Sequence, residues 1–275
     1  MSEAERVICP VASLDDPRIA RYRNLKDRDL ARQGGLFIAE GPLVVRRLLA
    51  SDYDTESVLL AERKVDAVAP LVPAGVPIYV APAGVVSRIV GFRFHSGVMA
   101  CGRRKCLPAL GDVARGWPAR VTLVVLPKIT STENLGALLR ISSAFGADAV
   151  VLGPSCCDAF HRQSVRVSMG AVFRLTLVRS RDLAADLRLL RDRWGVAPAA
   201  AVLDDEAEPL AGAARPDRLA LLFGNEAEGL SSEHVALCDR RITVPMRLGT
   251  DSLNVAVAAA VFLYHFTSAQ PKAGP

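Results

Sequence analysis

The chain has 275 residues, 51% of them hydrophobic, so it can bury a sizeable core in one large domain or two ordinary ones. Its net charge is +5, and residues 1–106 carry most of the surplus, with 16 Lys and Arg against 12 Asp and Glu. The apolar run at residues 255–266 is shorter than the about 20 residues of a membrane span, and no signal pattern is found at the N-terminus, so we expect a cytoplasmic protein without a membrane partner.

The first part of the sequence predicts a small α/β domain over residues 1–106. Helices are expected over residues 16–35 and 41–51, the first ending at a pair of glycines. Short strands are expected at residues 36–39, 57–61, 77–81 and 97–101. The next stretch holds two prolines and two glycines, which predicts a linker over residues 107–118.

Two basic clusters in this part of the chain indicate a polyanionic partner. The first lies in residues 18–32 and comprises Arg18, Arg21, Arg23, Lys26, Arg28 and Arg32. The second lies in residues 84–111, which contain no acidic residue, and comprises Arg88, Arg93, Arg103, Arg104 and Lys105. Such clusters are typical of nucleic-acid binding. The first is equally consistent with a solvated helix face, but the second favours RNA or DNA.

After residue 118, short apolar runs alternate with helical patterns. The run at residues 121–126 is continuously apolar, as in a strand buried on both faces. Further strands are expected at 148–153, 173–178, 199–203, 219–224 and 242–245. Helices are expected at 134–146, 161–171, 181–195, 231–238 and after residue 252. This alternation predicts an α/β fold with a mostly parallel sheet covered by helices on both faces.

Several common chemistries of α/β proteins lack their sequence signatures here. No two glycines are spaced Gly-x-Gly, and neither a P-loop nor a Gly-x-Ser-x-Gly motif is present. Six cysteines are scattered along the chain, and none forms a Cys-x-x-Cys pair. We therefore expect reduced thiols and no metal site.

Polar residues follow three of the predicted strands. The first group, Asn134, Gly136 and Arg140, belongs to the helical segment after residues 121–126. The second follows residues 219–223 and comprises Gly224, Asn225, Glu226, Glu228 and Gly229. The third spans residues 244–254. Because ligands of open parallel sheets bind at the carboxyl ends of strands, the three groups predict one shared site.

The start of the last helix carries more polar side chains than a helix cap needs. Asp251, Ser252 and Asn254 precede an almost wholly apolar run. One such side chain suffices to accept hydrogen bonds from the free N–H groups of the first turn. The surplus leaves two interpretations open, namely a cap alone or a ligand site at the helix N-terminus.

The three segments together resemble the motifs of the SpoU/TrmH branch of the SPOUT RNA methyltransferases. The first motif is matched at Asn134, Gly136 and Arg140. The second is matched at Gly224, Glu226, Gly229 and Leu230, and the third at Val244, Pro245, Met246, Ser252, Leu253, Asn254 and Val255. Residues 166–170 and 25–41 are also similar to this family, the latter to its attached substrate-binding domain. Departures occur at Glu133, Ile141 and Ala227.

The resemblance implies a methyltransferase domain over residues 119–275 with a deep trefoil knot formed by the last helix. It also implies bound S-adenosylmethionine, a homodimer with the active site at the interface, and no metal. The implied reaction methylates a ribose 2′-hydroxyl in structured RNA, with ribosomal (23S) RNA favoured over transfer RNA. A transfer RNA methyltransferase and a catalytically weak RNA-binding member are the alternatives. An unrelated α/β enzyme acting on an anionic small molecule would not need the basic N-terminal domain.

The same resemblance implies roles for individual residues. The catalytic candidates are Asn134, Arg140, Glu226, Ser252 and Asn254. The cofactor-binding candidates are Gly224, Asn225, Val244, Met246 and Leu253. Since a guanidinium hardly deprotonates, we expect Arg140 to act as a hydrogen-bond donor rather than as a base. Glu226 is expected to orient Arg140 or the neighbouring loops.

Overall fold

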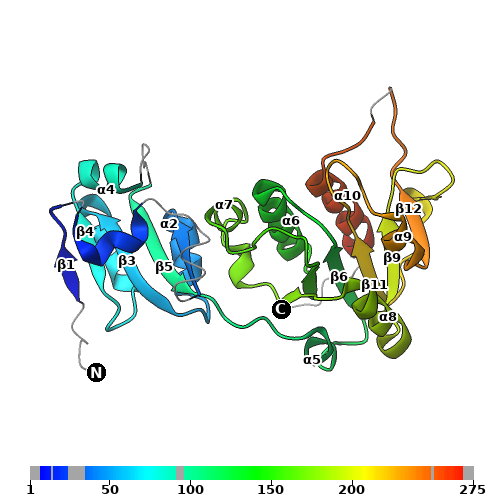
Figure 1. Cartoon of the computed structure of the whole chain (residues 1–275), viewed down its shortest axis with the longest axis horizontal. Coiled ribbons are helices and arrows are strands. Elements are labelled where there is room, and N and C mark those ends of the chain that lie inside the picture. Colours follow the sequence, from blue (N-terminus) through cyan, green and yellow to red (C-terminus); the bar gives the residue numbers. More distant parts are fainter. Residues whose placement is uncertain (1–6, 14, 24–34, 91–95, 249–250, 269–275) are drawn as a thin grey trace. The chain divides into compact units, whose positions relative to one another are not determined.

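The computed structural model of the protein describes residues 7–13, 15–23, 35–90, 96–248 and 251–268, with the backbone alone at residues 87–90. The chain divides into two compact units (Figure 1). Unit 1 comprises Met1–Cys106 together with Ala159–Arg174, and unit 2 comprises Leu107–Asp158 and Leu175–Pro275. The chain therefore leaves unit 2 after residue 158 and returns to it at residue 175.

Unit 1 contains a five-stranded mixed sheet in the order β1-β4-β3-β5-β2. Its strands are β1 (Ile8–Pro10), β2 (Leu36–Glu40), β3 (Thr55–Ala61), β4 (Ile78–Ala81) and β5 (Val98–Arg103). Its α-helices are α2 (Pro42–Leu49), α3 (Val65–Val68), α4 (Ala83–Val90) and α7 (Arg162–Val167). Short 3-10 helices span η1 (Pro17–Tyr22), η2 (Glu62–Lys64), η3 (Ala69–Leu71) and η4 (Ala171–Phe173). The helix expected over residues 16–35 is thus a 3-10 turn at its start, and residues 24–34 lie outside the described part.

The segment Ala159–Arg174 contributes aromatic side chains to the core of unit 1. The ring of Phe37 on β2 lies 5.2 Å from that of Phe160 and 5.5 Å from that of Phe173. Gly102 on β5 makes room for this packing, because a Cβ there would lie 2.4 Å from the Phe37 ring. The predicted domain boundary placed this segment wholly with residues 119–275. The structure differs because these contacts join segments more than 100 residues apart.

Unit 2 contains a seven-stranded parallel sheet in the order β10-β12-β9-β11-β6-β7-β8. Its strands are β6 (Val121–Leu126), β7 (Ala149–Leu152), β8 (Leu177–Arg179), β9 (Ala197–Ala201), β10 (Glu208–Pro209), β11 (Arg218–Leu222) and β12 (Arg240–Thr243). All six residues of β6 are buried, as expected for a strand covered on both faces. The mostly parallel α/β sheet predicted from the sequence is confirmed.

Helices cover the sheet of unit 2 on both faces (Figure 1). They are α5 (Leu110–Ala114), α6 (Thr132–Ala144), α8 (Leu183–Trp194), α9 (Ser232–Ala236) and α10 (Val255–Ser268), with the 3-10 turn η5 (Leu210–Gly212). On one face α5 and α8 pack in a core cluster with the inward residues of β6, β7 and β11. On the other, α6 and α10 pack against each other, and the Phe262 ring of α10 meets Phe223 edge to face.

Two segments of unit 2 differ from the sequence-based expectation. Residues 107–118, predicted as a linker, contain α5, and Leu110 is only 3% exposed within the core cluster. A single buried leucine between Pro and Gly residues gave no periodic signal. The strand expected at residues 173–178 begins only at Leu177, because a 3-10 turn precedes it.

Candidate functional site

A cavity of about 670 Å³ opens at the carboxyl ends of β9, β11 and β12. This volume is in the range of sites for small-molecule ligands and cofactors. All five predicted cofactor residues line it, namely Gly224, Asn225, Val244, Met246 and Leu253. Three of the predicted catalytic residues also line it, namely Glu226, Ser252 and Asn254. The second and third polar segments therefore meet at one cavity.

Part of the cavity wall comes from a segment that sequence reasoning missed. The residues after β9, Ala201–Asp204, line the cavity because β9 lies between β11 and β12 in the sheet. The two aspartates that follow this strand in the sequence were the available signal, since polar residues at a strand end mark the other segments too. Phe223 and Phe262 add apolar surface.

The loop after β11 is tightly closed on itself. Asn225 and Gly229 exchange two backbone hydrogen bonds, both of 2.9 Å. The side-chain oxygen of Asn225 also accepts from the backbone N–H groups of Ala227 at 2.9 Å and Glu228 at 3.3 Å. A Cβ on Gly224 would lie 2.1 Å from the backbone of Gly229. Residue 224 must therefore be glycine for the loop to close in this way.

A hydrogen-bonded network joins all three polar segments. Asn134 on α6 donates its side-chain amide to Glu226 at 2.8 Å. Its side-chain oxygen accepts from the amide of Asn254 at 3.0 Å. Asn225 donates to the second oxygen of Glu226 at 3.1 Å. The carboxylate of Glu226 thus fixes which way the Asn134 amide faces, and Asn134 in turn orients Asn254.

The starts of the two helices that carry this network are capped by different residues. Ser131 accepts a hydrogen bond from the N–H of Asn134 at 3.2 Å and so caps α6. Asn254 accepts from the N–H of Ala256 at 2.9 Å at the start of α10. Because Asn254 also donates to Asn134, it serves both as a cap and as part of the site. Ser252, at the cavity wall, takes no part in the cap and is exposed.

Acidic side chains outnumber basic ones in the cavity wall. Three carboxylates line it, from Asp204, Glu226 and Glu228, against the single guanidinium of Arg241. Arg241 pairs with Asp204 at 2.6 Å. Glu228 pairs at 2.7 Å with Lys128, which tethers the loop before α6 to the loop after β11. Of the three carboxylates, Glu226 alone accepts only from neutral amides in the described part of the chain, so its charge favours a ligand with a positive charge over a polyphosphate.

Arg140 stands apart from this network. Its side chain is exposed on α6, and no hydrogen bond or ion pair joins that side chain to another residue within the part of the chain that the structure describes. The two oxygens of Glu226 instead accept from Asn134 and Asn225. Of the two roles expected for Glu226, its contacts match the orientation of neighbouring loops rather than that of Arg140.

The basic stretches of unit 1 carry acidic partners that are distant in sequence. Arg103 pairs with Glu56 at 2.6 Å, and Lys105 pairs with Asp52 at 2.6 Å. Residues 84–111 contain no acidic residue, but acidic residues from other parts of the chain lie beside two of their basic side chains. The side chains of Lys26, Arg28, Arg32, Arg88 and Arg93 lie outside the described residues.

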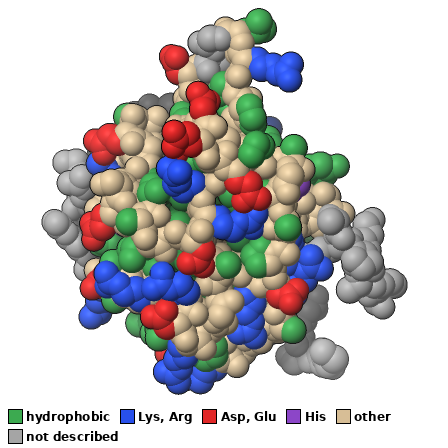
Figure 2. All heavy atoms as spheres, turned by 90° about the vertical axis from the view of Figure 1, so that its right-hand side faces the viewer, with side chains coloured by type: hydrophobic (Ala, Val, Ile, Leu, Met, Phe, Trp, Pro, Cys, Tyr) green, Lys and Arg blue, Asp and Glu red, His purple; other side chains and the backbone are tan. Residues whose placement is uncertain are grey.

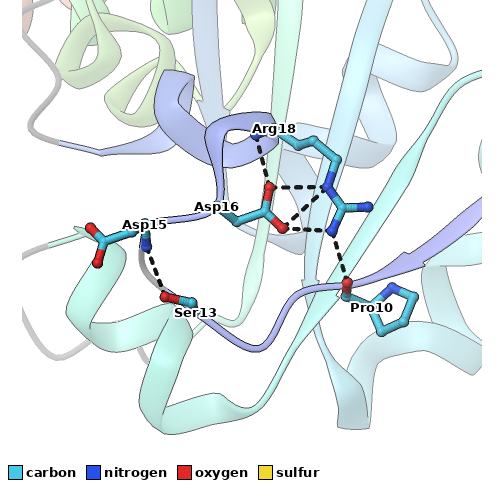
Figure 3. Close-up of polar contacts among 5 residues, drawn as sticks. All are labelled: Pro10, Ser13, Asp15, Asp16 and Arg18. Atoms are coloured by element: carbon cyan, nitrogen blue, oxygen red, sulfur yellow. Dashed lines mark hydrogen bonds and ion pairs between the residues drawn. The ribbon is translucent and has the colours of Figure 1, made fainter.

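The first basic cluster is neutralised in a similar way where it is described. Arg18 binds both carboxylate oxygens of Asp16 and donates to the carbonyl of Pro10 at 3.1 Å (Figure 3). These hydrogen bonds lower the pKa of Asp16 below its usual value. Arg21 and Arg23 approach Glu56 and Asp15 at 3.5 and 3.2 Å. Much of the basic surplus read from the sequence is thus paired.

Comparison with known proteins identifies the family. The profile of the SpoU rRNA Methylase family matches residues 121–264, just over half of the chain. A protein named uncharacterized tRNA/rRNA methyltransferase, from Mycobacterium bovis, is 38% identical over 278 residues, which cover 96% of this chain and 93% of that protein. The chain belongs to the SpoU rRNA Methylase family. All three polar segments lie inside the matched range.

Two further proteins named as rRNA methyltransferases are similar to this chain. The 23S rRNA (guanosine-2′-O-)-methyltransferase RlmB of Acinetobacter baylyi is 27% identical over 196 residues, covering 70% of this chain and 78% of that protein. A crystal structure of an AdoMet-bound rRNA methyltransferase from Sinorhizobium meliloti superposes with a TM-score of 0.80 at 25% identity, covering 94% of this chain and 97% of that one.

The described residues offer neither a membrane-spanning helix nor a cluster of metal ligands. They contain no helix that is long and apolar enough to cross a membrane. They also contain no group of three or more His, Cys, Asp and Glu side chains arranged for a metal ion.

Proposed function

We propose that this chain transfers the methyl group of S-adenosylmethionine to a ribose 2′-hydroxyl of structured RNA, with ribosomal RNA as the substrate. As a member of the SpoU family, the chain is an S-adenosylmethionine-dependent RNA methyltransferase. The observation that carries the finer proposal is the network that joins Asn134, Glu226 and Asn254 beside the cavity. The likeness to a named 23S rRNA guanosine-2′-O-methyltransferase supports the ribose and the ribosomal RNA.

The cavity fits the cofactor in charge and size. S-adenosylmethionine carries a sulfonium and an ammonium against one carboxylate, and the cavity wall holds more carboxylates than cations. The apolar side chains and the backbone groups of the cavity wall suit an adenosyl group. Gly224, Asn225, Val244, Met246 and Leu253 would hold it. When bound, the cofactor supplies a methyl group that is already activated on sulfur, so the reaction needs no metal.

The remaining task for the protein is to position the ribose hydroxyl and to stabilise it as it loses its proton. Arg140 is exposed and has no competing partner among the described residues, so its guanidinium is available to a substrate. A guanidinium is a poor base, and we assign it instead the role of donor to a phosphate or to the developing alkoxide. Asn134 and Asn254 hold the local geometry, and Ser252 lies at the cavity wall where substrate would enter.

We also infer that two copies of the chain associate through α10. Val257, Val261 and Tyr264 are 50%, 39% and 63% exposed, although α10 is largely apolar. Their spacing of four and three residues puts them on one stripe of the helix. A second copy of the same stripe would cover it, and the active site would then lie at the interface. We further infer that α10 forms the trefoil knot expected from the family.

The association is tested by light scattering on the purified protein. The wild type should have the mass of a dimer, and Val261→Glu should shift it to the monomer, because a charge would be buried in the contact. A wild type of monomer mass at micromolar concentration would contradict the dimer.

The activity is tested in two steps. S-adenosylmethionine should raise the unfolding temperature of the protein, whereas NADH should not. Radiolabelled cofactor is then incubated with total RNA from cells that lack the gene, and new 2′-O-methyl sites are mapped. Label in ribosomal RNA supports the proposal, label in transfer RNA alone supports the alternative substrate, and cofactor binding without transfer supports a catalytically weak RNA-binding protein.

A further inference from the structure

The basic residues of unit 1 differ in whether a carboxylate lies within ion-pair distance of them. Those at the end of β5 and in η1 have carboxylates within 2.5–3.5 Å. Those in the last turn of α2, Arg46 and Arg47, have none within ion-pair distance in the described part of the chain. A paired guanidinium must give up its carboxylate to bind a phosphate, whereas an uncompensated one need not.

The guanidinium of Arg47 is hydrogen-bonded to a neutral group, so no carboxylate offsets its positive charge. Its guanidinium donates to the backbone carbonyl of Met169 at 2.5 Å. The turn at Met169 and Gly170 has positive φ angles of 55° and 79°. A Cβ at Gly170 would lie 3.2 Å from the Cβ of Arg47, so α2 lies directly against this turn. The contact joins residues that are 122 positions apart.

α7, which precedes the same turn in the chain, adds two more arginines. Arg162 and Arg166 approach a single carboxylate, that of Glu40, at 3.7 and 4.0 Å. At 4.0 Å, this carboxylate only partly offsets the charge of the exposed Arg166. Glu40 is buried, with a side chain only 8% exposed, while the Arg166 side chain is 50% exposed. The acid therefore lies beneath the surface and the cationic group of Arg166 lies on it.

We propose that the last turn of α2 and α7 form a phosphate-binding surface for RNA, in which Arg46, Arg47 and Arg166 contact the backbone of the substrate. The inference rests on the proposed function for the identity of the polyanion. Guanidinium groups match phosphate oxygens in geometry and hold their charge at every physiological pH. Placing Arg46 and Arg47 at a helix C-terminus also stabilises α2, but that effect does not account for the exposed Arg166.

This surface replaces the one that the sequence indicated. Charge along the sequence pointed to Arg103 and Lys105, which the structure pairs with Glu56 and Asp52. Arg46 and Arg47 are only two residues in a mostly apolar helix, and Arg166 is far from them in sequence. Only the packing of Ala159–Arg174 within unit 1 brings Arg47 against the turn that follows Arg166.

The test compares two double variants of the full chain that lose the same charge. Arg46→Gln/Arg166→Gln removes two exposed groups of the proposed surface, and Arg103→Gln/Lys105→Gln removes two paired groups from the same unit. Binding to a fluorescent RNA hairpin is measured from 50 to 300 mM salt. Each lost phosphate contact should flatten the log–log salt slope by roughly 0.7–0.9. We expect a drop of about 1.4–1.8 for the first variant and little change for the second.

Turnover separates this surface from the catalytic site. At limiting RNA the first variant should methylate total RNA at least 10-fold more slowly than the wild type, and at saturating RNA it should approach the wild-type rate. Its response to S-adenosylmethionine should be that of the wild type, because neither side chain lines the cavity. Its unfolding temperature should fall only slightly, because both side chains are exposed and Arg46 adds only a helix-end charge to α2.

Two results would overturn the inference, namely an unchanged salt slope in Arg46→Gln/Arg166→Gln, or an equal drop in both double variants. A wild type that binds the hairpin but transfers no methyl group to any RNA would instead count against the proposed function. The salt slopes would still decide whether the surface binds phosphate.

Discussion

Asn254, just before α10, donates a hydrogen bond of 3.0 Å to the side chain of Asn134 on α6, across 120 positions of sequence. The same Asn254 side chain accepts from the N–H of Ala256 and so caps α10. One residue thus ties the start of the last helix to the first polar segment. A cap and a site contact are separable duties, because different atoms of the amide perform them.

Substituting Asn254 separates the two duties. Asn254→Ser should keep the cap, since serine caps helices about as well as asparagine, but should lose the donor to Asn134. Asn254→Ala should lose both and lower the free energy of unfolding by about 1 kcal/mol. We expect both variants to transfer methyl at least 10-fold more slowly, with only the alanine variant destabilised in urea titrations. A serine variant of wild-type activity would show that the contact to Asn134 is dispensable.

Arg140→Ala should abolish methyl transfer and leave cofactor affinity within about 3-fold of wild type. The side chain is exposed and forms no bond to other described residues, so stability should change by no more than about 0.5 kcal/mol. Arg140→Lys should also fail, because an ammonium cannot reproduce the planar fork of donors. Single-turnover assays at saturating RNA measure methyl transfer, and calorimetry measures cofactor binding. Near-normal turnover in the alanine variant would contradict the catalytic role of Arg140.

Gly224→Ala should weaken cofactor binding by at least 10-fold. The added Cβ would lie 2.1 Å from the backbone of Gly229, so the loop after β11 would have to open. Gly212→Ala is the matched control, since a Cβ there meets no atom within 4 Å. The thermal shift produced by S-adenosylmethionine reports both. Equal shifts in the two variants would mean that the closed loop does not shape the binding site.

Leu110→Ala should lower the free energy of unfolding by about 2–4 kcal/mol. Leu110 is almost fully buried in the core cluster between α8 and the sheet of unit 2. Val113→Ala, at a partly buried position of the same helix, should cost less. Denaturant titrations of the two variants test whether residues 107–118 are part of the folded unit. A loss below 1 kcal/mol for Leu110→Ala would return this segment to the role of a linker.

Alkylation should discriminate among the cysteines by burial. Burial raises the pKa of the Cys238 thiol to about 12 and that of Cys157 to about 11. The thiolate is the reactive form, so at pH 8 its population at Cys238 should be lower by roughly three orders of magnitude than that of a free thiol. Exposed Cys106 should be labelled by iodoacetamide first. Peptide mass spectrometry of the native protein over time measures the order, and labelling of Cys238 at the rate of Cys106 would contradict it.

The sequence alone determined the parallel sheet and the polar segments at its carboxyl edge. Continuously apolar strands such as Val121–Leu126 can only be buried on both faces, and parallel strands place their carboxyl ends together. Gly224, Glu226 and Asn254 could therefore be assigned to one site before any contact was known. These motifs can be recognised from the sequence because each consists of a few residue types at fixed, short spacings.

The tertiary structure decided every relationship that spans a long separation in sequence. It selected Asn254 rather than Ser252 as the cap of α10, and it added Ala201–Asp204 to the cavity because β9 pairs with both β11 and β12. It also placed Glu56 beside Arg103 and left Arg46 and Arg166 without full compensation. Charge along a sequence is a one-dimensional sum, whereas ion pairing depends on distances of a few ångströms that only strand order and packing set.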